Sequence, residues 1–232
     1  NKQIPRYKKL SPIVLPVFYN KVGLMDHMRK NPKSFPYKDG NTLFCASKNW
    51  DKFISKYMRV IPNKPKYYEW IPQASKLPFY MDIEYYWHKE YNEPIKSLLI
   101  LFELFAKEKS HQILDEKLQW KISRATRIKT VDDKNYMYHS FHVVLDTKKN
   151  YFKSQMDIQI YIKNIIYWAQ NNVDANIVNH WKNTCVEHPK KKESPTIIDF
   201  GIYCKSLGAR SAFRMPLSCK ADGADILRPW DI

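Results

Sequence analysis

The residues best suited to chemistry in this chain are acidic side chains inside apolar segments. Asp82 and Glu84 lie in the apolar, aromatic segment 79–87. Residues at positions i and i+2 of a strand share a face, so both carboxylates project together while Ile83 points into the core. Two carboxylates on one face of an apolar strand are costly unless a cation compensates, and a divalent metal is one candidate. The alternative is an ordinary solvated strand face.

Asp199 adds a third acidic group. It interrupts the segment 196–202, which is otherwise apolar enough for a central strand. A lone Asp there must be ion-paired, hydrogen-bonded or bound to metal. Three carboxylates on adjacent strands would form a hard-oxygen site suited to Mg²⁺ or Mn²⁺. Such a site could hold two ions for phosphoryl or nucleotidyl transfer.

Polar and basic residues elsewhere could complete this site. Ser140 and His142 share a strand face by the same spacing, and together they could donate hydrogen bonds to phosphate oxygens. The alternative is a histidine at the edge of the core, bonded to a neighbour. Arg214 and Lys220 follow the Asp199 segment and could neutralise a triphosphate, or they could belong to a plain basic loop.

Several other chemistries are excluded by missing motifs. The patterns G-x-x-x-x-G-K-[ST], H-E-x-x-H, G-x-S-x-G and G-x-G-x-x-G do not occur, and five glycines are few for Rossmann-type phosphate loops. The cysteines Cys45, Cys185, Cys204 and Cys219 are scattered without a C-x-x-C pair. This spacing predicts no zinc ribbon in the fragment, and free thiols are typical of a reducing intracellular compartment.

The hydrophobic pattern predicts the elements that position these residues. Strands are expected at 42–46, 67–71, 79–87, 138–145 and 196–203. Helices are expected at 49–58, 95–107 and 152–170. An exposed basic strand or loop is expected at 121–129, and prolines predict a largely irregular segment 1–40. The sum is an α+β chain with no convincing linker.

Composition limits the class of protein. The chain has 232 residues, 44% of them hydrophobic and 15% aromatic, which excludes intrinsic disorder. The longest apolar run, 97–106, contains Glu103 and is short of the about 20 residues of a membrane span. No signal peptide opens the chain, and a start at Asn1 predicts a fragment of a longer protein. The net charge of +16 favours a nucleic acid or another polyanion as partner, with a Lys-rich compositional bias as the alternative.

The order of the motifs resembles the archaeo-eukaryotic primase superfamily, in its primase-polymerase (PrimPol) branch. That branch includes primase modules of herpesviruses and large cytoplasmic DNA viruses. The resemblance is closest at 68–72, Tyr-Glu-Trp-Ile-Pro, where the family has Y-E-x-I-P before its D-x-E strand. A second close stretch is 198–203 followed by Phe213-Arg214 and Ser218-Cys219-Lys220, where the family has D-x-G-V-Y, F-R and S-S-K. The matched motifs extend from about residue 41 to residue 220.

The resemblance implies a fold and roles for the site residues. It implies a single primase-polymerase domain over 1–232, with two α+β modules, an RRM-like sheet and an active-site cleft between two small sheets. Asp82, Glu84 and Asp199 would bind two Mg²⁺ or Mn²⁺ ions. The remaining roles are nucleotide binding by Ser140, His142, Arg214 and Lys220, and template binding by Arg124, Arg127 and Lys129.

The implied activity is template-dependent nucleotidyl transfer on single-stranded DNA, in primer synthesis or extension from NTPs or dNTPs. A helicase in the same chain or complex is an expected partner, a membrane is not, and the expected location is a viral replication site in the host cytoplasm or nucleus. The family's zinc module is absent from the fragment, so extension is expected to exceed initiation. Tyr138 also departs from the basic residue of many relatives, and the loop from Asp199 to Arg214 is longer. A two-metal nuclease and a non-catalytic single-stranded nucleic-acid-binding module are the alternatives.

Overall fold

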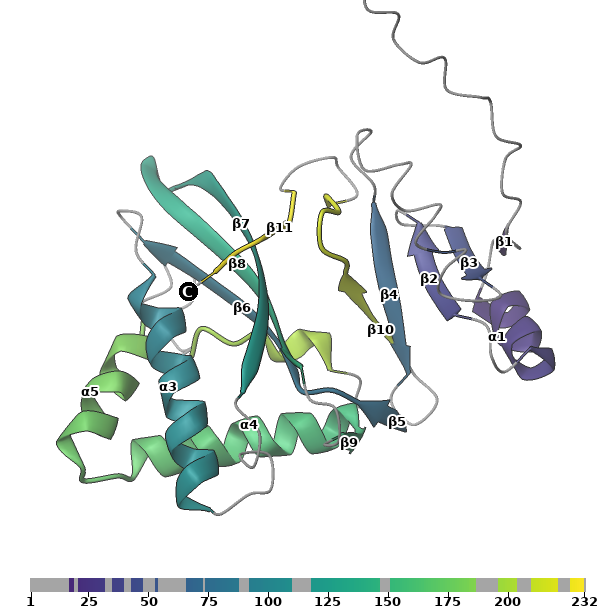
Figure 1. Ribbon diagram of the computed structural model, residues 1–232. Coiled ribbons are helices and arrows are strands. Elements are labelled where there is room, and N and C mark those ends of the chain that lie inside the picture. Colours follow the sequence, from purple (N-terminus) through teal and green to yellow (C-terminus); the bar gives the residue numbers. More distant parts are fainter. Residues whose placement is uncertain are drawn as a thin grey trace, which may run out of the picture.

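The structure is a computed structural model with a mixed α+β architecture. It describes residues 17–18, 21–31, 35–39, 43–47, 53, 66–72, 74–87, 92–109, 118–146, 151–186, 196–203, 210–220 and 226–231. Within these residues lie three antiparallel sheets and four α-helices (Figure 1). None of the helices in this part of the chain is both long enough and apolar enough to cross a membrane.

The four-stranded sheet is built around a long hairpin. Its strand order is β11 (Arg228–Pro229), β7 (Gln119–Val131), β8 (Lys134–Asp146) and β6 (Tyr80–Trp87). Ile198 forms an isolated antiparallel bridge with Ile83, so residues 197–199 extend this sheet beyond β6. With α3 (Glu93–Glu108) after β6 and α4 (Gln155–Gln170) after β8, the chain order is β-α-β-β-α-β. The spatial order is β7, β8, β6 and the bridge segment.

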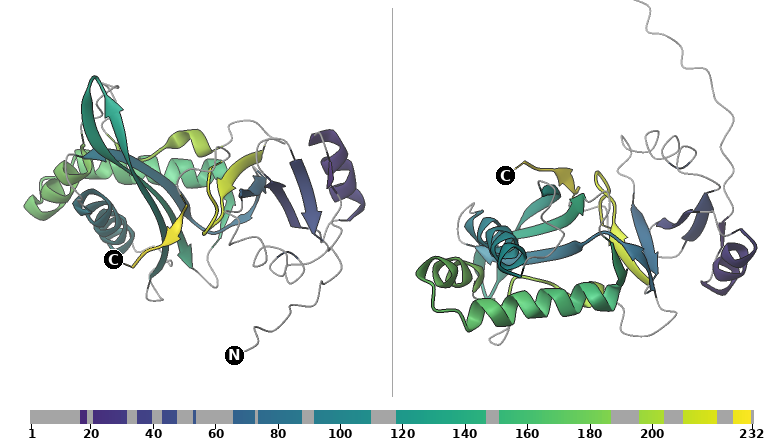
Figure 2. Two further views of the ribbon diagram at one scale, coloured as in Figure 1. Left: turned by 90° about the horizontal axis from the view of Figure 1, so that it is seen from above. Right: turned by 60° about the horizontal axis from the view of Figure 1, so that its bottom comes forward.

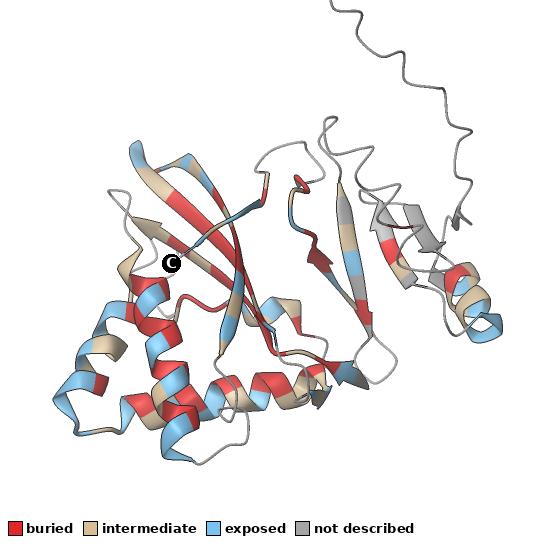
Figure 3. Ribbon diagram, viewed as in Figure 1, coloured by how far each residue is buried: buried red, intermediate tan, exposed pale blue. Residues whose placement is uncertain are grey.

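Helices α3 and α4 pack against the four-stranded sheet through aromatic and aliphatic side chains. The Phe102 ring of α3 lies 4.6 Å from Phe79, 4.8 Å from Trp120 and 5.6 Å from Tyr161 of α4, measured between centroids. Most of β8 and the first half of β6 are buried (Figure 3). This core gives the strands a fixed register, and the register decides which side chains share the opposite face.

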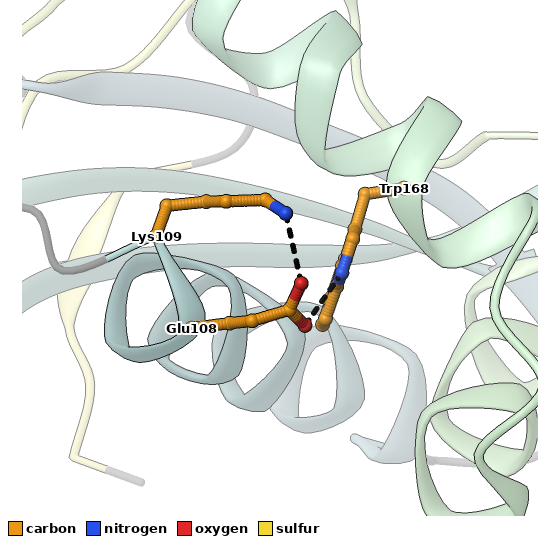
Figure 4. Close-up of polar contacts among 3 residues, drawn as sticks. All are labelled: Glu108, Lys109 and Trp168. Atoms are coloured by element: carbon orange, nitrogen blue, oxygen red, sulfur yellow. Dashed lines mark hydrogen bonds and ion pairs between the residues drawn. The ribbon is translucent and has the colours of Figure 1, made fainter.

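A polar contact joins the ends of α3 and α4. The Trp168 indole N–H of α4 donates to Glu108 Oε2 at 2.8 Å, and Lys109 Nζ contacts Glu108 Oε1 at 2.8 Å (Figure 4). The two partners lower the pKa of the exposed Glu108 carboxyl, with the Lys109 hydrogen bond as the largest cause. The contact is exposed, so it adds little to stability and mainly orients the helix ends.

The five-stranded sheet lies beside the first one (Figures 1 and 2). Its order is β1 (Val17–Phe18), β3 (Leu43–Ser47), β2 (Phe35–Asp39), β4 (Tyr67–Pro72) and β10 (Arg210–Arg214). Strands β4 and β10 stand between β6 and the β2–β3 pair, and α1 (Lys21–Lys30) packs at the far end. A third, two-stranded sheet pairs β5 (Ala74–Leu77) with β9 (Phe152–Ser154).

Gln155 connects the two larger sheets through α4. Its fully buried side chain donates from Nε2 to the Ile71 carbonyl oxygen of β4 at 2.9 Å. Its Oε1 accepts from the Ser211 hydroxyl of β10 at 3.2 Å. A buried amide with both ends bonded ties the first turn of α4 to two strands of the other sheet, since leaving either end unsatisfied would be costly.

Most predicted elements are confirmed. The strands expected at 42–46, 67–71, 79–87 and 138–145 are β3, β4, β6 and β8, and the helix at 95–107 is α3. The basic segment 121–129 is the strand β7. The helix expected at 152–170 begins at Gln155, because 152–154 pairs as β9 and the Ser154 hydroxyl caps the Asp157 N–H. The helix expected at 49–58 falls outside the described residues apart from Phe53.

One expectation was wrong, and two segments contain elements that the sequence pattern did not predict. The strand expected over 196–203 stops after Ile198, and the 3₁₀ helix η3 (Phe200–Ile202) follows, because the Asp199 carboxylate accepts from the Gly201 N–H at 2.7 Å. Segment 1–40 contains α1 and β2, and Pro36 fits β2 because pairing with β4 begins only at Tyr37. Helix α5 (Ala175–Thr184), capped by Asp174, lies in a segment that the apolar pattern did not mark.

Candidate functional site

Strand pairing places the predicted polar residues on one face of the four-stranded sheet. Asp82 of β6 lies opposite His142 of β8, and Glu84 lies opposite Ser140. Partners in an antiparallel register project to the same side. The other side carries Ile83 and Phe141, both fully buried. We call the polar side the site face.

The bridge segment brings Asp199 to this face. The Asp199 N–H donates to the Asp82 carbonyl oxygen at 2.9 Å, and the Glu84 N–H donates to the Ile197 carbonyl oxygen at 2.7 Å. This antiparallel pairing sets Asp199 beside Asp82, with Ile198 and Ile83 together on the core side. The three carboxylates predicted from the sequence therefore lie on neighbouring backbone segments.

Gly201 lies in close contact with the Asp199 carboxylate. Its N–H holds Asp199 Oδ1 at 2.7 Å, and a Cβ atom added at Gly201 would stand 3.0 Å from that oxygen. This distance is tighter than nine in ten real Cβ contacts, so the Asp199 carboxylate would have to shift by a few tenths of an ångström to admit a side chain at this position. The glycine is thus part of the cradle that orients Asp199.

Asp82 is the buried member of the carboxylate group. Its Oδ1 has no hydrogen-bond partner in the described part of the chain. Burial raises the pKa of Asp82 well above its ordinary range, and the negative charges of Glu84 and Asp199 raise it further, while Arg214 and Lys220 oppose the shift. A buried carboxylate oxygen without a donor, beside two other carboxylates, is satisfied best by a cation.

His142 is a neutral ring in this arrangement. Burial and the nearby Arg214 and Lys220 charges lower its pKa to about 3, against a weaker opposing effect of the Arg214 backbone bond. His142 Nδ1 lies 3.0 Å from the Arg214 carbonyl oxygen, and because a carbonyl only accepts, Nδ1 carries the proton. Nε2 is then an acceptor, 3.7 Å from Asp82 Oδ1. Donation from Nε2 to a phosphate, as the sequence suggested, therefore needs a second proton.

The cations reach the site from outside the four-stranded sheet. Arg214 ends β10 and is 3% exposed, and Lys220 follows it after a turn. The Phe213 ring of β10 stacks on the His142 ring at 4.2 Å with an interplanar angle of 23°, which joins the two sheets at the site. The predicted cations and carboxylates thus meet at the junction of two sheets.

The three predicted template residues divide between two faces. Arg127 and Lys129 of β7 share the site face, because Arg127 pairs with Tyr138, whose neighbour along that face is Ser140. Arg124 lies on the other face, with its guanidinium 5.8 Å from the Phe141 ring centroid and 5.6 Å from that of Trp230. Strand alternation carried this signal, although the sequence interpretation did not use it.

Tyr138 is a site-face residue that the sequence interpretation noted only as a departure. It is 3% exposed and lies near the Glu84 carboxylate, which acts on its pKa. Burial and the Glu84 charge raise the pKa of Tyr138 far above its ordinary value, so the hydroxyl keeps its proton. The signal for it was its place two residues before Ser140 on the same strand face.

The residues present offer the chemistry of a divalent-metal site. Carboxylate oxygens are the ligands that Mg²⁺ and Mn²⁺ prefer, and the unsatisfied Asp82 Oδ1 fits such an ion. As the side chains stand, no group of three or more His, Cys, Asp or Glu residues in the described ranges is arranged to hold a metal. Binding would therefore require Glu84 or Asp199 to turn toward Asp82.

A separate hollow lies on the core side of the sheet. Its volume is about 560 Å³, and it lies between α3, β7 and the chain near Trp230, with Trp120 and Ile122 in its wall. None of the predicted site residues lines it. This hollow is therefore separate from the site face.

Comparison with known proteins does not assign this chain to a family. No protein-family model matches the chain, and no curated protein sequence matches it significantly.

Proposed function

We propose that this chain is a primase-polymerase domain that catalyses template-dependent nucleotidyl transfer on single-stranded DNA. The observation that carries the proposal is the convergence of Asp82, Glu84 and Asp199 on one sheet face, with Arg214 and Lys220 close enough to lower the pKa of Asp82 from the side. The motifs are distant in sequence, and their order alone did not require them to meet.

The fold offers a second line of support. The β-α-β-β-α-β order, with β8 and β6 central and the bridge segment beside β6, is the arrangement expected of an RRM-like sheet. The second sheet contributes Arg214 through β10. A two-module primase fold with its active site between two sheets is therefore the architecture that we propose.

In this mechanism Asp82, Glu84 and Asp199 would hold two Mg²⁺ or Mn²⁺ ions. When bound, the ions would supply activation of a primer 3′-hydroxyl and stabilisation of the leaving pyrophosphate. Arg214 and Lys220 bind the triphosphate of an incoming NTP or dNTP.

The polar residues of β8 complete the nucleotide site. The Ser140 hydroxyl donates to a phosphate oxygen. His142 gains the proton that it needs for the same task when bound phosphate offsets the Arg214 and Lys220 charges that lower its pKa. The basic surface of this +16 chain holds the template through its phosphates.

The test is primer extension. The protein is incubated with Mn²⁺, a primed single-stranded template and nucleotides, and the products are sized. Lengthened products support the proposal, and shortened products without extension would replace it with a two-metal nuclease. Asp82→Ala and Asp199→Ala should abolish synthesis and retain DNA binding. A wild-type protein that binds DNA but never extends a supplied primer would favour a non-catalytic binding module.

Lys220 gives a more local test. Lys220→Ala should raise the apparent KM for nucleotide about tenfold, as expected for a lost charge-assisted contact, with little change in template affinity. Lys107→Ala is the matched control, because Lys107 is an exposed residue near the end of α3. An unchanged nucleotide KM in Lys220→Ala would remove Lys220 from the proposed site.

A further inference from the structure

The hollow on the core side of the four-stranded sheet has two tryptophans in its wall. Its volume is about 560 Å³, and the half-buried Trp120 and Trp230 line it together with Ile122. The Trp230 N–H donates to the Ile122 carbonyl oxygen at 2.9 Å, which continues the pairing of β11 with β7. Trp120 lies two residues before Ile122 on the same strand face. Diagonal neighbours across two strands are within reach of aromatic side chains, so both indole rings border one space.

Both rings are held in place by the protein. The Trp120 indole N–H donates to Glu103 Oε1 of α3 at 3.0 Å. The Trp230 ring lies 5.2 Å from the Phe141 ring between centroids, and the Arg124 guanidinium lies 5.6 Å from the Trp230 centroid. A ligand that stacks on these rings would therefore pay little to order them.

Charged side chains of both signs stand at the rim of the hollow. Lys96 of α3 and Asp231 line it, and both are exposed. Arg228 of β11 is also exposed, and it lies two residues before Trp230 on the same strand face. The rim thus offers two cations and a hydrogen-bond acceptor around an aromatic wall.

This combination matches one nucleotide of a single strand. Tryptophan stacks on an unpaired base, Asp231 can accept from a base amino group, and Lys96 and Arg228 can bind a phosphate. A hydrocarbon ligand would leave the charged rim unused. A free triphosphate would bring several negative charges beside the carboxylates of Glu103 and Asp231, whereas a phosphodiester brings one. A base of a duplex is paired and stacked, so it cannot enter.

The hollow is close enough to the proposed active site for one DNA strand to contact both. β11 is the edge strand of the sheet (Figure 1). The register sets Pro229 opposite Ser123, Ser123 opposite His142, and His142 opposite Asp82. Neighbouring strands are about 4.8 Å apart, so the edge lies roughly 14 Å from Asp82 along this row. A strand that rounds the edge at β11 would pass from the hollow to the site face.

We propose that the hollow binds one unpaired base of single-stranded DNA, stacked on Trp230 and Trp120, with Arg228 and Lys96 on the adjoining phosphates. The inference rests on the proposed function in taking single-stranded DNA as the partner, and it adds a contact on the reverse face of the sheet. Arg124 then supports the Trp230 ring from within the protein.

The test measures affinity for a short single-stranded oligonucleotide by fluorescence anisotropy. The titrations are made in EDTA without nucleotides, at several salt concentrations, and the Tm of every variant is recorded. Trp230→Ala removes the ring, Trp230→Phe keeps a smaller ring, and Arg228→Ala removes one cation. The matched controls are Trp168→Ala, a half-buried tryptophan of α4, and Arg29→Ala, an exposed arginine of α1.

The ring and the cation should give different signatures. Trp230→Ala should weaken binding about tenfold, within the range for one lost base stack, and Trp230→Phe should stay within about threefold of wild type. Neither should change the slope of log K against log salt, because stacking releases no counterion. Arg228→Ala should reduce that slope by about 0.7, as for one phosphate contact on a single strand. The controls should leave the affinity within about twofold, and duplex affinity should not respond to Trp230→Ala.

Other outcomes overturn the inference. A folded Trp230→Ala protein with wild-type affinity would remove the base from the hollow. If Trp230→Ala does not fold, the salt slope of Arg228→Ala decides, and an unchanged slope counts against the site. Weaker binding of a free dNTP in Trp230→Ala, with DNA binding unchanged, would make the hollow a nucleotide site instead.

The two proposals can fail separately. A wild-type protein whose DNA binding depends on Trp230 but which never extends a supplied primer would refute the polymerase activity and leave the hollow as a DNA site. Primer extension by wild type, with unchanged DNA affinity in folded Trp230→Ala, would do the reverse.

Discussion

Replacing Asp82 by asparagine should make the metal-free protein more stable and the metal-loaded protein less stable than wild type. Asp82→Asn keeps the shape of the side chain and removes its charge. The Asp82 carboxylate is buried, its Oδ1 lacks a hydrogen-bond partner among the described residues, and Glu84 and Asp199 lie beside it. Without a bound cation, each of these features opposes the charged form.

The size of the effect follows from these neighbours. Two unit charges about 5 Å apart repel by about 3 kcal/mol at an effective dielectric constant of 20. Arg214 and Lys220 offset much of the repulsion from Glu84 and Asp199. With an unsatisfied buried acceptor adding about 1–3 kcal/mol, we expect a net gain of about 1–2 kcal/mol for Asp82→Asn. At about 2–4 °C per kcal/mol for a domain of this size, Tm rises by about 2–8 °C.

The assay is thermal unfolding of both proteins in EDTA and in Mn²⁺. Mn²⁺ at about 100 times its Kd should stabilise wild type by about 2.7 kcal/mol and leave Asp82→Asn unchanged, so the order of the two Tm values reverses. In EDTA the difference should shrink as pH falls. The raised pKa of Asp82 means that the folded wild type regains stability when the carboxyl is protonated, and loses it as pH rises through that pKa.

The control is Asp146→Asn. Asp146 is an exposed residue of β8 whose Oδ2 contacts Lys121 Nζ at 2.7 Å. Its replacement should change the free energy of unfolding by less than about 0.5 kcal/mol in either buffer. An Asp82→Asn protein that melts below wild type in EDTA would refute the reasoning, since Asp82 would then be a structurally paired carboxylate rather than one that awaits a cation.

Three further predictions concern the site and the residue that connects the two larger sheets. Gly201→Ala should weaken Mn²⁺ binding about fivefold with Tm nearly unchanged, because the new Cβ would stand 3.0 Å from Asp199 Oδ1. An unchanged Mn²⁺ affinity would contradict the role of Gly201 beside Asp199. Gln155→Ala should lower the free energy of unfolding by about 1–3 kcal/mol in denaturant titration, because the Ile71 carbonyl loses a buried donor. The His142 ring should stay neutral in NMR titration down to about pH 5 without nucleotide, because its pKa is about 3 in the folded protein against 6.5 in the unfolded chain. The unfolded chain then binds a proton that the folded protein does not, so this residue lowers the stability of the fold as pH falls below 6.5. A titration midpoint near 6.5 would refute the assigned environment.

The site face could be predicted from the sequence because strands alternate. The apolar segments 79–87 and 138–145 are long enough that the period of two fixes Asp82, Glu84, Ser140 and His142 to one face of each strand. What alternation cannot give is which strands are neighbours. The pairing of β6 with β8, and of residues 197–199 with β6, depends on tertiary packing.

Asp199 shows where pattern reasoning fails. An apolar run predicted a long strand, but the Asp199 side chain competes for backbone donors and turns the chain into η3. The local signal was Gly201 two residues later, since a small residue there lets the carboxylate reach the backbone. Gln155 is a second case, because no sequence pattern marks a glutamine that will be fully buried between two sheets.

The separation of charges between the two sheets has a mechanical consequence. The carboxylates belong to β6 and the bridge segment, whereas Arg214 belongs to β10. The Phe213–His142 stack and the bond from His142 Nδ1 to the Arg214 carbonyl connect the two sheets at the site. A triphosphate held by Arg214 on one side and by metal on the other would add a further link across the same junction. Nucleotide binding at the proposed site should therefore stiffen the junction, and the His142 Nδ1–H bond to the Arg214 carbonyl is available in either protonation state of the ring.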